Sequence, residues 1–339
     1  MATLSTTHLT MLDWSKRLDP DGKTADIVEM LSQTNDILED MLFKEGNLPT
    51  GEQTSIRTGL PTVYYRQINA GVPSSKSTTA QVVENTAILE GRSEIDQDEA
   101  ELNGNTSEYR MSEGQAFVEA MGQAQATTLI YGSASSPEEY SGLATRYSDK
   151  SAPNGDNIID AGGTGSDNAS VYLVGWGERS IFGVFPKGSV AGLTHEDLGV
   201  QDSFDAGTEN RYRAYHDLYK WKNGLVVKDW RYGVRIANVD VSDLVAQTGT
   251  QASNAATAII KLMSRAIDHL PNISSVRPAF YVNRTVASHL RVAALDKSSS
   301  AVTIEPALNQ FGETIHNMVF LGVPVRLVDV LTNAEAQVT

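Results

Sequence analysis

The chain has 339 residues, of which 40% are hydrophobic and 20% are charged, and its formal net charge at pH 7 is −15. The hydrophobic share is too high for a chain that is disordered throughout. The acidic balance argues against a dedicated nucleic-acid-binding protein, because phosphate backbones attract lysine and arginine. Cysteine is absent, which excludes disulfides, thiolate metal sites and cysteine nucleophiles. The length suits two ordinary domains or one extended subunit of several parts.

The N-terminal residues predict a protein that is not exported by the usual route. Met1–Thr10 is polar and rich in threonine, and it lacks the basic stretch and apolar run of a signal peptide. No apolar run approaches the roughly 20 residues that cross a bilayer. We therefore expect a soluble protein that is made in a reducing cytosol.

A helix is predicted after the polar segment that ends at Asp19 and Pro20. Thr24 is a suitable N-cap, and Gly46 and Pro49 mark the end of the helix. The positions that recur at helical spacing are Ile27, Met30, Leu31, Thr34, Leu38, Met41 and Leu42.

The pattern changes between Gly51 and Ile95, where threonine, valine, tyrosine and isoleucine dominate. Turn-forming residues at Gly59–Pro61 and Gly71–Ser75 predict a long, exposed hairpin with strands near Ser55–Asn69 and Thr78–Ile95. The region has too few large apolar residues to bury itself on its own chain. A floppy loop and an arm that packs on a neighbouring molecule fit the sequence equally well, and both interpretations stay open.

A long helix is predicted over Ser107–Tyr131, which lacks proline and is rich in alanine, glutamine, glutamate and methionine. Asn105 precedes it as a cap, and Gly132 is a natural C-terminal stop. Its length would be roughly 35–40 Å, which suits a strut, although Gly114 and Gly122 weaken it. A partial apolar stripe is formed by Met111, Val118, Met121, Leu129 and Ile130.

The rest of the chain predicts strands followed by a mixed module of helices and strands. Gly142–Ser170 is rich in loops, and the alternating residues that include Trp230 and Ile236 indicate a half-buried strand. Alternating helices and strands point to a compact α/β or α+β unit. The predicted strands are Val171–Val174, Ser180–Phe185, Tyr212–Trp221, Leu225–Val239, Ala279–Val282, Met318–Phe320 and Val323–Leu327, and the predicted helices are Asn254–Leu270 and Arg284–Leu295.

The sequence contains no motif that indicates catalysis. His195-Glu196 begins like a zinc-protease motif, but the second histidine is missing. Neither a nucleophile elbow nor a phosphate-binding Walker loop occurs.

Two glycine-rich motifs are candidates for ligand binding. Gly175-Trp176-Gly177 is similar to a dinucleotide fingerprint, yet Ser180 stands at its third glycine position. A strand is predicted next, so the phosphate would lack a helix N-terminus. Gly162–Asp167 matches a single calcium-binding nonapeptide, which needs stacked copies, so a glycine-rich turn is the better interpretation. We therefore predict no catalytic, cofactor-binding or metal-binding residue and no cofactor.

Two groups of residues are candidates for contacts. Carboxylates gather at Glu94, Asp96, Asp98, Glu99 and Glu101. So dense a run is typical of a solvated face, or of a partner for lysine and arginine on another subunit. The second group is Tyr64, Tyr65 and Arg66, which could stack on a nucleotide, although the acidic balance favours strand pairing.

A set of short motifs runs through nearly the whole chain. The first are Leu9–Trp14, Leu18–Gly22 and Leu31–Asp40, which read LTMLDW, LDPDG and LSQTNDILED. The others are Gly46–Gly51, Arg57–Pro61, Ala100–Asn105, Asp160–Asn168, Val174–Gly177, Asp229–Tyr232 and Arg235–Asn238. As a set they resemble the major capsid proteins of short-tailed bacteriophages similar to phage epsilon-fifteen.

The resemblance implies an α+β protein with the HK97-like fold of tailed-phage capsids. It divides the chain into an N-terminal arm and helix (1–50), an extended loop in the form of a β-hairpin (51–100), the spine helix of a peripheral domain (101–155), peripheral-domain strands (156–240) and an axial domain (241–339). In many relatives the axial domain precedes the last peripheral strands, whereas here the predicted strand Leu225–Val239 comes first. The resemblance therefore implies a permuted connectivity.

The function that the resemblance implies is structural. Many copies would form the icosahedral head that encloses the double-stranded DNA genome, in the virion capsid, after assembly in the host bacterial cytoplasm. The implied partners are other copies in hexamers and pentamers, separate scaffold, portal and decoration proteins, and packaged DNA without sequence-specific binding, but no membrane. Contacts between subunits are expected at Tyr64, Tyr65, Arg66, Glu94, Asp96, Asp98, Glu99 and Glu101.

An alternative from another class stays open. The glycine-rich turns at Gly175–Gly177 and Gly162–Asp167 could bind a nucleotide or calcium, in an enzyme or in a secreted adhesive module. Stabilisation by a ligand against heat would favour this alternative.

Overall fold

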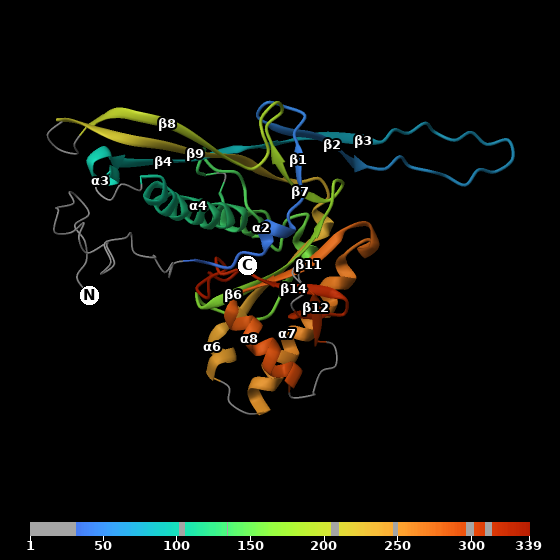
Figure 1. The fold of residues 1–339 in the computed structure, drawn as a ribbon. Helices are drawn as coiled ribbons and strands as arrows, with labels where there is room; N and C mark the ends of the chain where they lie inside the picture. The colour runs from blue at the N-terminus through green and yellow to red at the C-terminus, as the bar shows by residue number, and fades with distance from the viewer. Residues whose placement is uncertain are drawn as a thin grey trace. The chain divides into compact units, whose positions relative to one another are not determined.

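The computed structural model describes residues 32–101, 106–133, 135–204, 210–246, 250–295, 302–308 and 314–339 (Figure 1). The chain forms two compact units. Among the described residues, the first unit takes in 32–33, 88–125 and 192–222, and the second takes in 34–87, 126–191 and 223–339. The chain crosses between the units within the helix Thr106–Tyr131 (α4) and within the strand Arg211–Val227 (β9).

The predicted N-terminal helix differs from the structure over its second half. Its first half, up to Leu31, lies outside the described residues. Beyond it, the helix is limited to the single turn Ile37–Asp40 (α2), and Phe43–Glu45 (β1) is a strand. β1 pairs in parallel with Ile181–Phe185 (β7). The helical prediction is wrong here because β7 supplies the backbone partners that a helix would have supplied, while Met41 still enters the core.

In the first unit, the long helix packs against a small sheet. The strands Leu193–Phe204 (β8) and β9 are antiparallel, and Ala87–Asp96 (β4) lies beside β9 in the strand order. A short helix, Gln97–Glu101 (α3), follows β4. Phe117 of α4 stacks on Tyr219 of β9, with ring centroids 5.7 Å apart. The helix predicted over 107–131 is confirmed.

β8 is a strand that the sequence did not predict. Most of its side chains are exposed, so it lacks the alternation of apolar and polar residues that signals a half-buried strand. Its pairing runs from Leu193 opposite Trp221 to Phe204 opposite Arg211, with a register shift between Asp197 and Gly199. Backbone pairing with β9 holds it in place, not burial of its side chains.

The strand Asn168–Trp176 (β6) lies at the centre of the second unit, in a sheet where its end at Trp176 also pairs in parallel with β7. β6 pairs with β10 on one side and with β11 on the other, both antiparallel. Pairing continues from β10 to β5, and from β11 through β14 and β13 to β12. The bounds are Ile158–Asp160 (β5), Gly233–Asp240 (β10), Arg277–Val282 (β11), Val302–Leu308 (β12), Thr314–Phe320 (β13) and Val323–Leu327 (β14).

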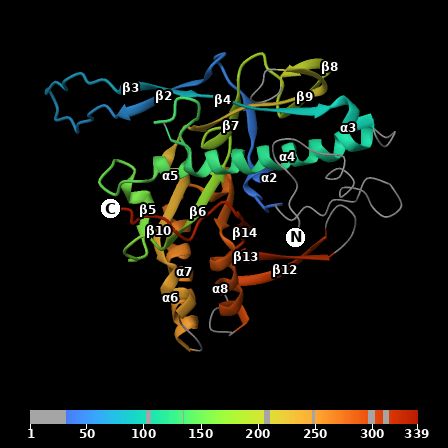
Figure 2. The same ribbon diagram turned by 90° about the vertical axis from the view of Figure 1, so that its left-hand side faces the viewer.

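β6 is buried on both faces, because alternate side chains of a strand point to opposite sides and each side has its own core. Val171 and Leu173 pack with the helices Thr250–His269 (α7) and Arg284–Leu295 (α8), which cover one face (Figure 2). Tyr172, Val174 and Trp176 join the core of the other face. That second core also takes in the last turn of α4 and the short helix Leu143–Arg146 (α5). The helix Val241–Ala246 (α6) leads from β10 into α7.

The predicted strand Leu225–Val239 is two strands. β9 ends at Val227, a 3₁₀ turn covers Trp230–Tyr232, and β10 begins at Gly233. The carboxylate of Asp229 accepts a hydrogen bond from the backbone N–H of Arg231 and caps this turn. A turn initiated by aspartate therefore interrupts a run of residues with strand-like alternation. The other strands and helices predicted after Ser170 are confirmed, with ends that differ by a few residues.

The predicted hairpin is paired only at its base. Gly51–Gly59 (β2) and Thr78–Asn85 (β3) form a two-stranded antiparallel sheet, which projects at the right of Figure 1. Residues 60–77 are in neither strand, so the prediction of a strand up to Asn69 is wrong. The second predicted strand, Thr78–Ile95, is divided at Thr86 between β3 and β4.

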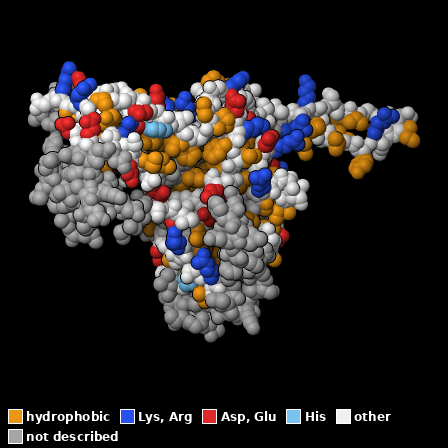
Figure 3. All heavy atoms as spheres, in the orientation of Figure 1, with side chains coloured by type: hydrophobic (Ala, Val, Ile, Leu, Met, Phe, Trp, Pro, Cys, Tyr) orange, Lys and Arg blue, Asp and Glu red, His pale blue; other side chains and the backbone are white. Residues whose placement is uncertain are grey.

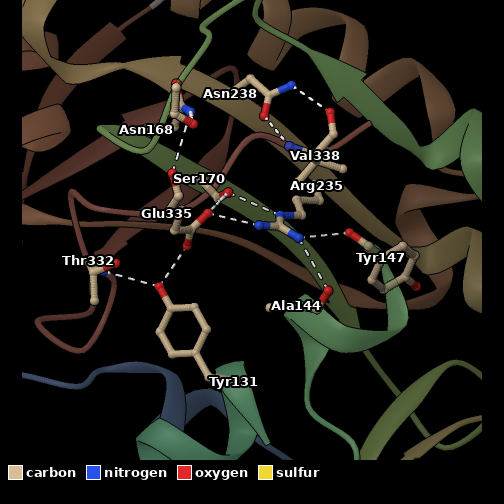
Figure 4. A network of polar contacts seen from close by, with 11 residues as sticks. Tyr131, Ala144, Tyr147, Asn168, Ser170, Arg235, Asn238, Thr332, Glu335 and Val338 are labelled. Carbon is tan, nitrogen blue, oxygen red and sulfur yellow. Dashed lines mark hydrogen bonds and ion pairs between the residues drawn. The ribbon is translucent and has the colours of Figure 1, made fainter. Parts of the chain in front are cut away.

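Residues 328–339 are anchored to β10 by a buried polar network (Figure 4). The guanidinium of Arg235 donates to Glu335 Oε2 at 2.8 Å, to Ser170 Oγ at 3.0 Å and to the carbonyl oxygen of Tyr147 at 2.8 Å. Glu335 also accepts from the hydroxyls of Ser170 and Tyr131. Burial and the Glu335 carboxylate raise the pKa of Tyr131 to about 12, so its hydroxyl remains a donor at neutral pH.

A second attachment of the C-terminal residues to β10 is made by Asn238, three residues after Arg235. Asn238 Nδ2 donates to the carbonyl oxygen of Val338 at 3.0 Å, and the Val338 N–H donates to Asn238 Oδ1 at 2.8 Å. Asn238 adopts a φ of +59° at the point where the pairing of β10 with β6 shifts register. The bulge turns the Asn238 amide toward the C-terminal residues, so that one irregularity in β10 serves as an attachment point.

Removing the Glu335 carboxylate will destabilise the chain strongly. Glu335→Ala leaves the Arg235 guanidinium buried without its counter-charge, and breaking a buried ion pair costs about 3–5 kcal/mol of unfolding free energy. The matched control is Glu178→Ala, which breaks an exposed pair with Lys44 at 3.3 Å and costs less than about 1 kcal/mol. Denaturant unfolding of unassembled chains measures both, and equal losses would contradict the role of the network.

Two glycines of α4 will respond in opposite directions to alanine. A Cβ at Gly122 meets nothing within 4 Å, so Gly122→Ala stabilises by up to about 1 kcal/mol through helix propensity. A Cβ at Gly114 would lie 2.4 Å from the Tyr219 hydroxyl. That ring is held between Phe117 and His195, so overpacking costs about 1–3 kcal/mol. Thermal unfolding of both variants tests this, and a gain in both would show that Tyr219 moves freely.

Candidate functional site

Residues 60–77, which we call the hairpin tip, are exposed along their whole length. Leu60, Val63 and Tyr65 are 81%, 86% and 108% exposed. Hydrogen bonds within the tip include one from the Ala70 N–H to Gln67 and one from Ser75 Oγ to Thr62. The large apolar side chains of the tip are therefore exposed to solvent, on a segment that lies outside the paired strands.

The charge of the hairpin is opposite to that of the chain as a whole. Residues 53–83 contain the basic residues Arg57, Arg66 and Lys76 and no acidic residue, whereas the whole chain carries −15. In Figure 3 the projecting segment shows hydrophobic and basic side chains. A surface that is both apolar and basic suits an acidic, apolar partner.

The base of the hairpin is fixed by ion pairs within the second unit. The Arg146 guanidinium donates to both carboxylate oxygens of Glu84 at 2.6 Å, and Lys228 Nζ lies 2.9 Å from Glu52 Oε1. These side chains are mostly buried. At Gly51 a Cβ would lie 1.9 Å from the carbonyl oxygen of Glu84, so only glycine fits there. Ion pairs and close packing hold the base of the hairpin, whereas the tip beyond it is exposed.

The structure brings the five predicted acidic residues together on β4 and α3 of the first unit. The glutamates of this acidic cluster accept hydrogen bonds from tyrosine hydroxyls of the same unit. These pairs are Tyr212 with Glu94 at 2.8 Å, Tyr109 with Glu99 at 2.6 Å and Tyr215 with Glu101 at 3.1 Å. Asp96 accepts from the Asp98 N–H, and the Asp98 side chain is exposed. Part of the cluster thus serves its own subunit.

Glu94 is linked through hydrogen bonds to polar side chains of β8 and β9. Burial raises the pKa of Glu94, but hydrogen bonds from Ser203 and Tyr212 outweigh it and leave that pKa below its ordinary value. Ser203 Oγ lies 2.8 Å from His216 Nε2, and both side chains are buried. The ionised form of Glu94 is therefore the form that the first unit stabilises.

A groove lies between α4 and the β8–β9 hairpin in the first unit, and we call it the α4 groove. Its volume is about 630 Å³, within the range of ligand-binding pockets. Met111 and Val118 of α4 and Leu193 of β8 line its apolar part. The sequence placed Met111 and Val118 in one stripe with Met121, but Met121 is buried whereas these two are exposed. Helical spacing does not separate these two residues from the buried members of the stripe, so no local pattern in the sequence could have located the groove.

Charged side chains line the rest of the α4 groove. Arg110 donates to both oxygens of Asp217, at 2.7 and 3.2 Å, and lies 2.8 Å from Asp197 Oδ1. His195 Nε2 lies 2.9 Å from Asp217 Oδ1. The hydrogen bond from Arg110 lowers the pKa of Asp197, and the two aspartates raise the pKa of Arg110.

The two glycine-rich turns are occupied by their own chain. After β6, the Gly177 N–H donates to the Ile181 carbonyl oxygen at 3.0 Å, and Ser180 Oγ donates to the Gly175 carbonyl oxygen at 2.7 Å. In the other turn, the Gly163 N–H donates to the Asn238 carbonyl oxygen at 2.8 Å.

Among the described residues, no three His, Asp or Glu side chains are grouped as a metal site requires. No described helix combines the length and the apolar character needed to cross a membrane.

Comparison with known proteins decides the family. Residues 19–339 match the family model of the major capsid protein GP7. The chain belongs to this family. A chain in the solved structure of bacteriophage epsilon15 is similar to it, with 28% sequence identity, a TM-score of 0.73 and 100% of both chains covered. The capsid of bacteriophage JBD30 gives 11% identity and a TM-score of 0.49 over 91% of this chain and 96% of that one. A search of curated proteins found no match.

As a member of the GP7 family, the protein is a structural component of the phage capsid and not an enzyme. It has the α+β, HK97-like capsid fold, as the sequence motifs implied, and it assembles with copies of itself in the virion capsid. The alternative of an enzyme or secreted adhesive module receives no support from the comparisons. The domain boundaries, the permuted connectivity and the contact residues stay predictions.

Acidification will reveal the role of Glu94 within its subunit. Its lowered pKa contributes stability above the unfolded-state value of about 4.3, and this contribution is lost as the pH falls through the folded-state pKa. Glu94→Gln should therefore be less stable than wild type at pH 7, and the difference should shrink between about pH 5 and 3. Thermal unfolding of the unassembled chain measures this. Asp98→Asn, at an exposed position of α3, is the control, and a constant difference for Glu94→Gln would contradict the assignment.

Proposed function

We propose that copies of this chain form the hexamers and pentamers of an icosahedral phage head through contacts made by the hairpin tip. The observation that carries this proposal is the exposure of Leu60, Val63, Tyr65 and Ile68 on one short segment. Monomeric proteins seldom expose so concentrated an apolar surface, and such surfaces are typical of interfaces. Of the two interpretations that the sequence left open, an arm on a neighbouring molecule accounts for these side chains.

The energetics favour association. Burying one valine, leucine or isoleucine side chain fully contributes about 1.5–3 kcal/mol. The tip exposes several such side chains, so covering them on another copy stabilises the assembly. Because each subunit both gives a tip and receives one, modest contacts add up across a closed shell.

Charge supports the proposed contact residues. Arg66 of one copy would meet carboxylates of the acidic cluster of another, among them Asp96, Asp98 and Glu99, while Tyr64 and Tyr65 supply aromatic area beside it. Complementary charge sets register and association rate more than affinity, and it is screened by salt. Glu94 and Glu101 contribute to the same negative surface even though tyrosines of their own unit bind them.

Family membership supports the remaining parts of the proposal. Residues 1–50 would be the arm, 51–100 the extended loop, 101–155 the spine-helix region, 156–240 the peripheral strands and 241–339 the axial domain. Separate scaffold, portal and decoration proteins would join the head in the host bacterial cytoplasm. Packaged DNA would face the inner surface without sequence-specific binding, as suits a chain with a net charge of −15.

Polar substitution of the tip will block assembly without unfolding the subunit. The variant Val63→Ser, Tyr65→Ser, Ile68→Ser removes apolar contacts between copies. Each 1.4 kcal/mol of association free energy lost in this way raises the concentration needed for assembly about tenfold. Circular dichroism and thermal unfolding should match wild type, because the tip contributes nothing to either core. Light scattering and electron microscopy measure shell formation.

The matched control is Val190→Ser with Val292→Ser, at positions that are also exposed but lie outside the hairpin. This variant should assemble at the wild-type concentration. Normal shells from the triple tip variant would refute the proposed role of the tip.

A further inference from the structure

We propose that a basic edge of the second unit binds an acidic turn of a second copy, so that copies join head to tail. The acidic turn is residues 136–139, which include two glutamates. Both surfaces belong to the second unit and lie outside the hairpin and the α4 groove. The residues of the basic edge are Arg179, Trp230, Arg231, Ile273 and Arg277.

Three turns of the second unit meet at the basic edge. The backbone N–H groups of Lys228 and Asp229 donate to the Ser180 carbonyl oxygen, at 2.9 and 3.4 Å. The hydroxyls of Tyr232 and Ser275 lie 3.2 Å apart, within hydrogen-bond distance. These contacts join the turn 177–180 after β6, the 3₁₀ turn Trp230–Tyr232 and the 3₁₀ turn Ile273–Ser275 before β11. They bring the side chains of segments far apart in the sequence to one edge of the unit.

Two arginines of the basic edge are available to a partner. Arg179 and Arg277 are exposed, and neither forms a hydrogen bond or an ion pair with any residue that the structure describes. The neighbouring Glu178 pairs instead with Lys44, at 3.3 Å. Guanidinium groups bind carboxylates through charge-assisted hydrogen bonds that are frequently paired. A surface that carries exposed carboxylates is therefore the fitting partner.

The apolar part of the basic edge favours a protein partner. Trp230 and Ile273 are 37% and 38% exposed. Arg231 donates to both carboxylate oxygens of Asp229, at 2.9 and 2.7 Å, so its charge is matched within the chain. Tryptophan and arginine are enriched among the residues that dominate protein–protein binding energies. DNA binding depends on many phosphate contacts, which two available arginines on a chain with a net charge of −15 do not supply.

The acidic turn supplies two carboxylates of the required kind. The Glu139 N–H donates to the Ser136 carbonyl oxygen at 3.0 Å, so Glu138 and Glu139 lie together on a tight turn. Both are exposed, and among the described residues neither has a hydrogen-bond or ion-pair partner. No other consecutive carboxylates in the described part of the second unit are both unpaired, because Asp40, which follows Glu39, accepts a hydrogen bond from Tyr281.

The contact is heterologous, because each copy gives its acidic turn to one neighbour and receives the turn of another on its basic edge. Contacts of this kind close into rings when the rotation between copies allows it. The inference therefore rests on the proposed function, in which copies form hexamers and pentamers. Complementary charge fixes the register of neighbours, while Trp230 and Ile273 contribute apolar area.

Charge reversal tests the contact. Arg179→Glu with Arg277→Glu places carboxylates on both sides of it, and Glu138→Arg with Glu139→Arg places guanidinium groups on both sides. Each double variant should raise the concentration needed for shell formation roughly tenfold or more, because like charges across an interface repel. The fourfold variant restores opposite charges and should assemble within about threefold of the wild-type concentration. Light scattering and electron microscopy measure assembly, and thermal unfolding of the unassembled chains should match wild type throughout.

The matched control is Arg265→Glu with Arg291→Glu, which makes the same charge change at exposed arginines of α7 and α8 and should assemble normally. Normal shells from either double variant overturn the contact, as does an equal loss in the control. Loss of assembly that the fourfold variant does not recover also overturns it, because another partner would then face one of the two surfaces. All of these results leave the proposed function standing, whereas failure of the wild-type chain to form any shell overturns the proposed function instead.

Discussion

The exposed apolar surface of the hairpin tip is the constraint on which the proposed function of this chain depends. A pair of strands reaches away from the core of the second unit, and beyond Gly59 it carries valine, tyrosine and isoleucine into water. Ion pairs at Glu84 and Glu52 fix its base firmly, so it does not collapse onto its own core. In the proposed assembly, another copy covers the tip and offsets the cost of this exposure.

The two units differ in how completely their strands and helices are buried. In the second unit, β6 is buried on both sides, and the C-terminal residues are attached to β10 through Arg235 and Asn238. In the first unit, β8 is mostly exposed and α4 leaves Met111 and Val118 uncovered. The hairpin tip is part of the second unit and carries most of its exposed large apolar side chains, so exposure in that unit is confined to the segment that projects from its core.

Much of the second unit could be predicted from sequence, because buried segments carry strong periodic signals. The helix Arg284–Leu295 and the strand Val323–Leu327 have the predicted bounds. Predictions failed where long-range pairing decided the outcome: β1 is held by β7 and β8 by β9, and neither contact is visible in local spacing. The strand predicted over 225–239 failed because a single aspartate, Asp229, caps a turn within it. The acidic residues were found as a group, yet their tyrosine partners come from distant segments that no local pattern connects to them.

The α4 groove shows why a surface of this kind escapes sequence analysis. Its wall takes residues from one helix and two strands, and its charged part depends on Arg110 meeting aspartates that are about a hundred residues away in the chain. Within α4, Met111 and Val118 looked like members of one core stripe, because a helical period cannot say which apolar residues will be covered. Folding decides that by burying Met121 and leaving these two exposed. The apolar side chains that remain exposed after folding are therefore the candidates for surfaces that assembly covers. In this chain they include those of the hairpin tip and, in the first unit, Met111 and Val118 of α4.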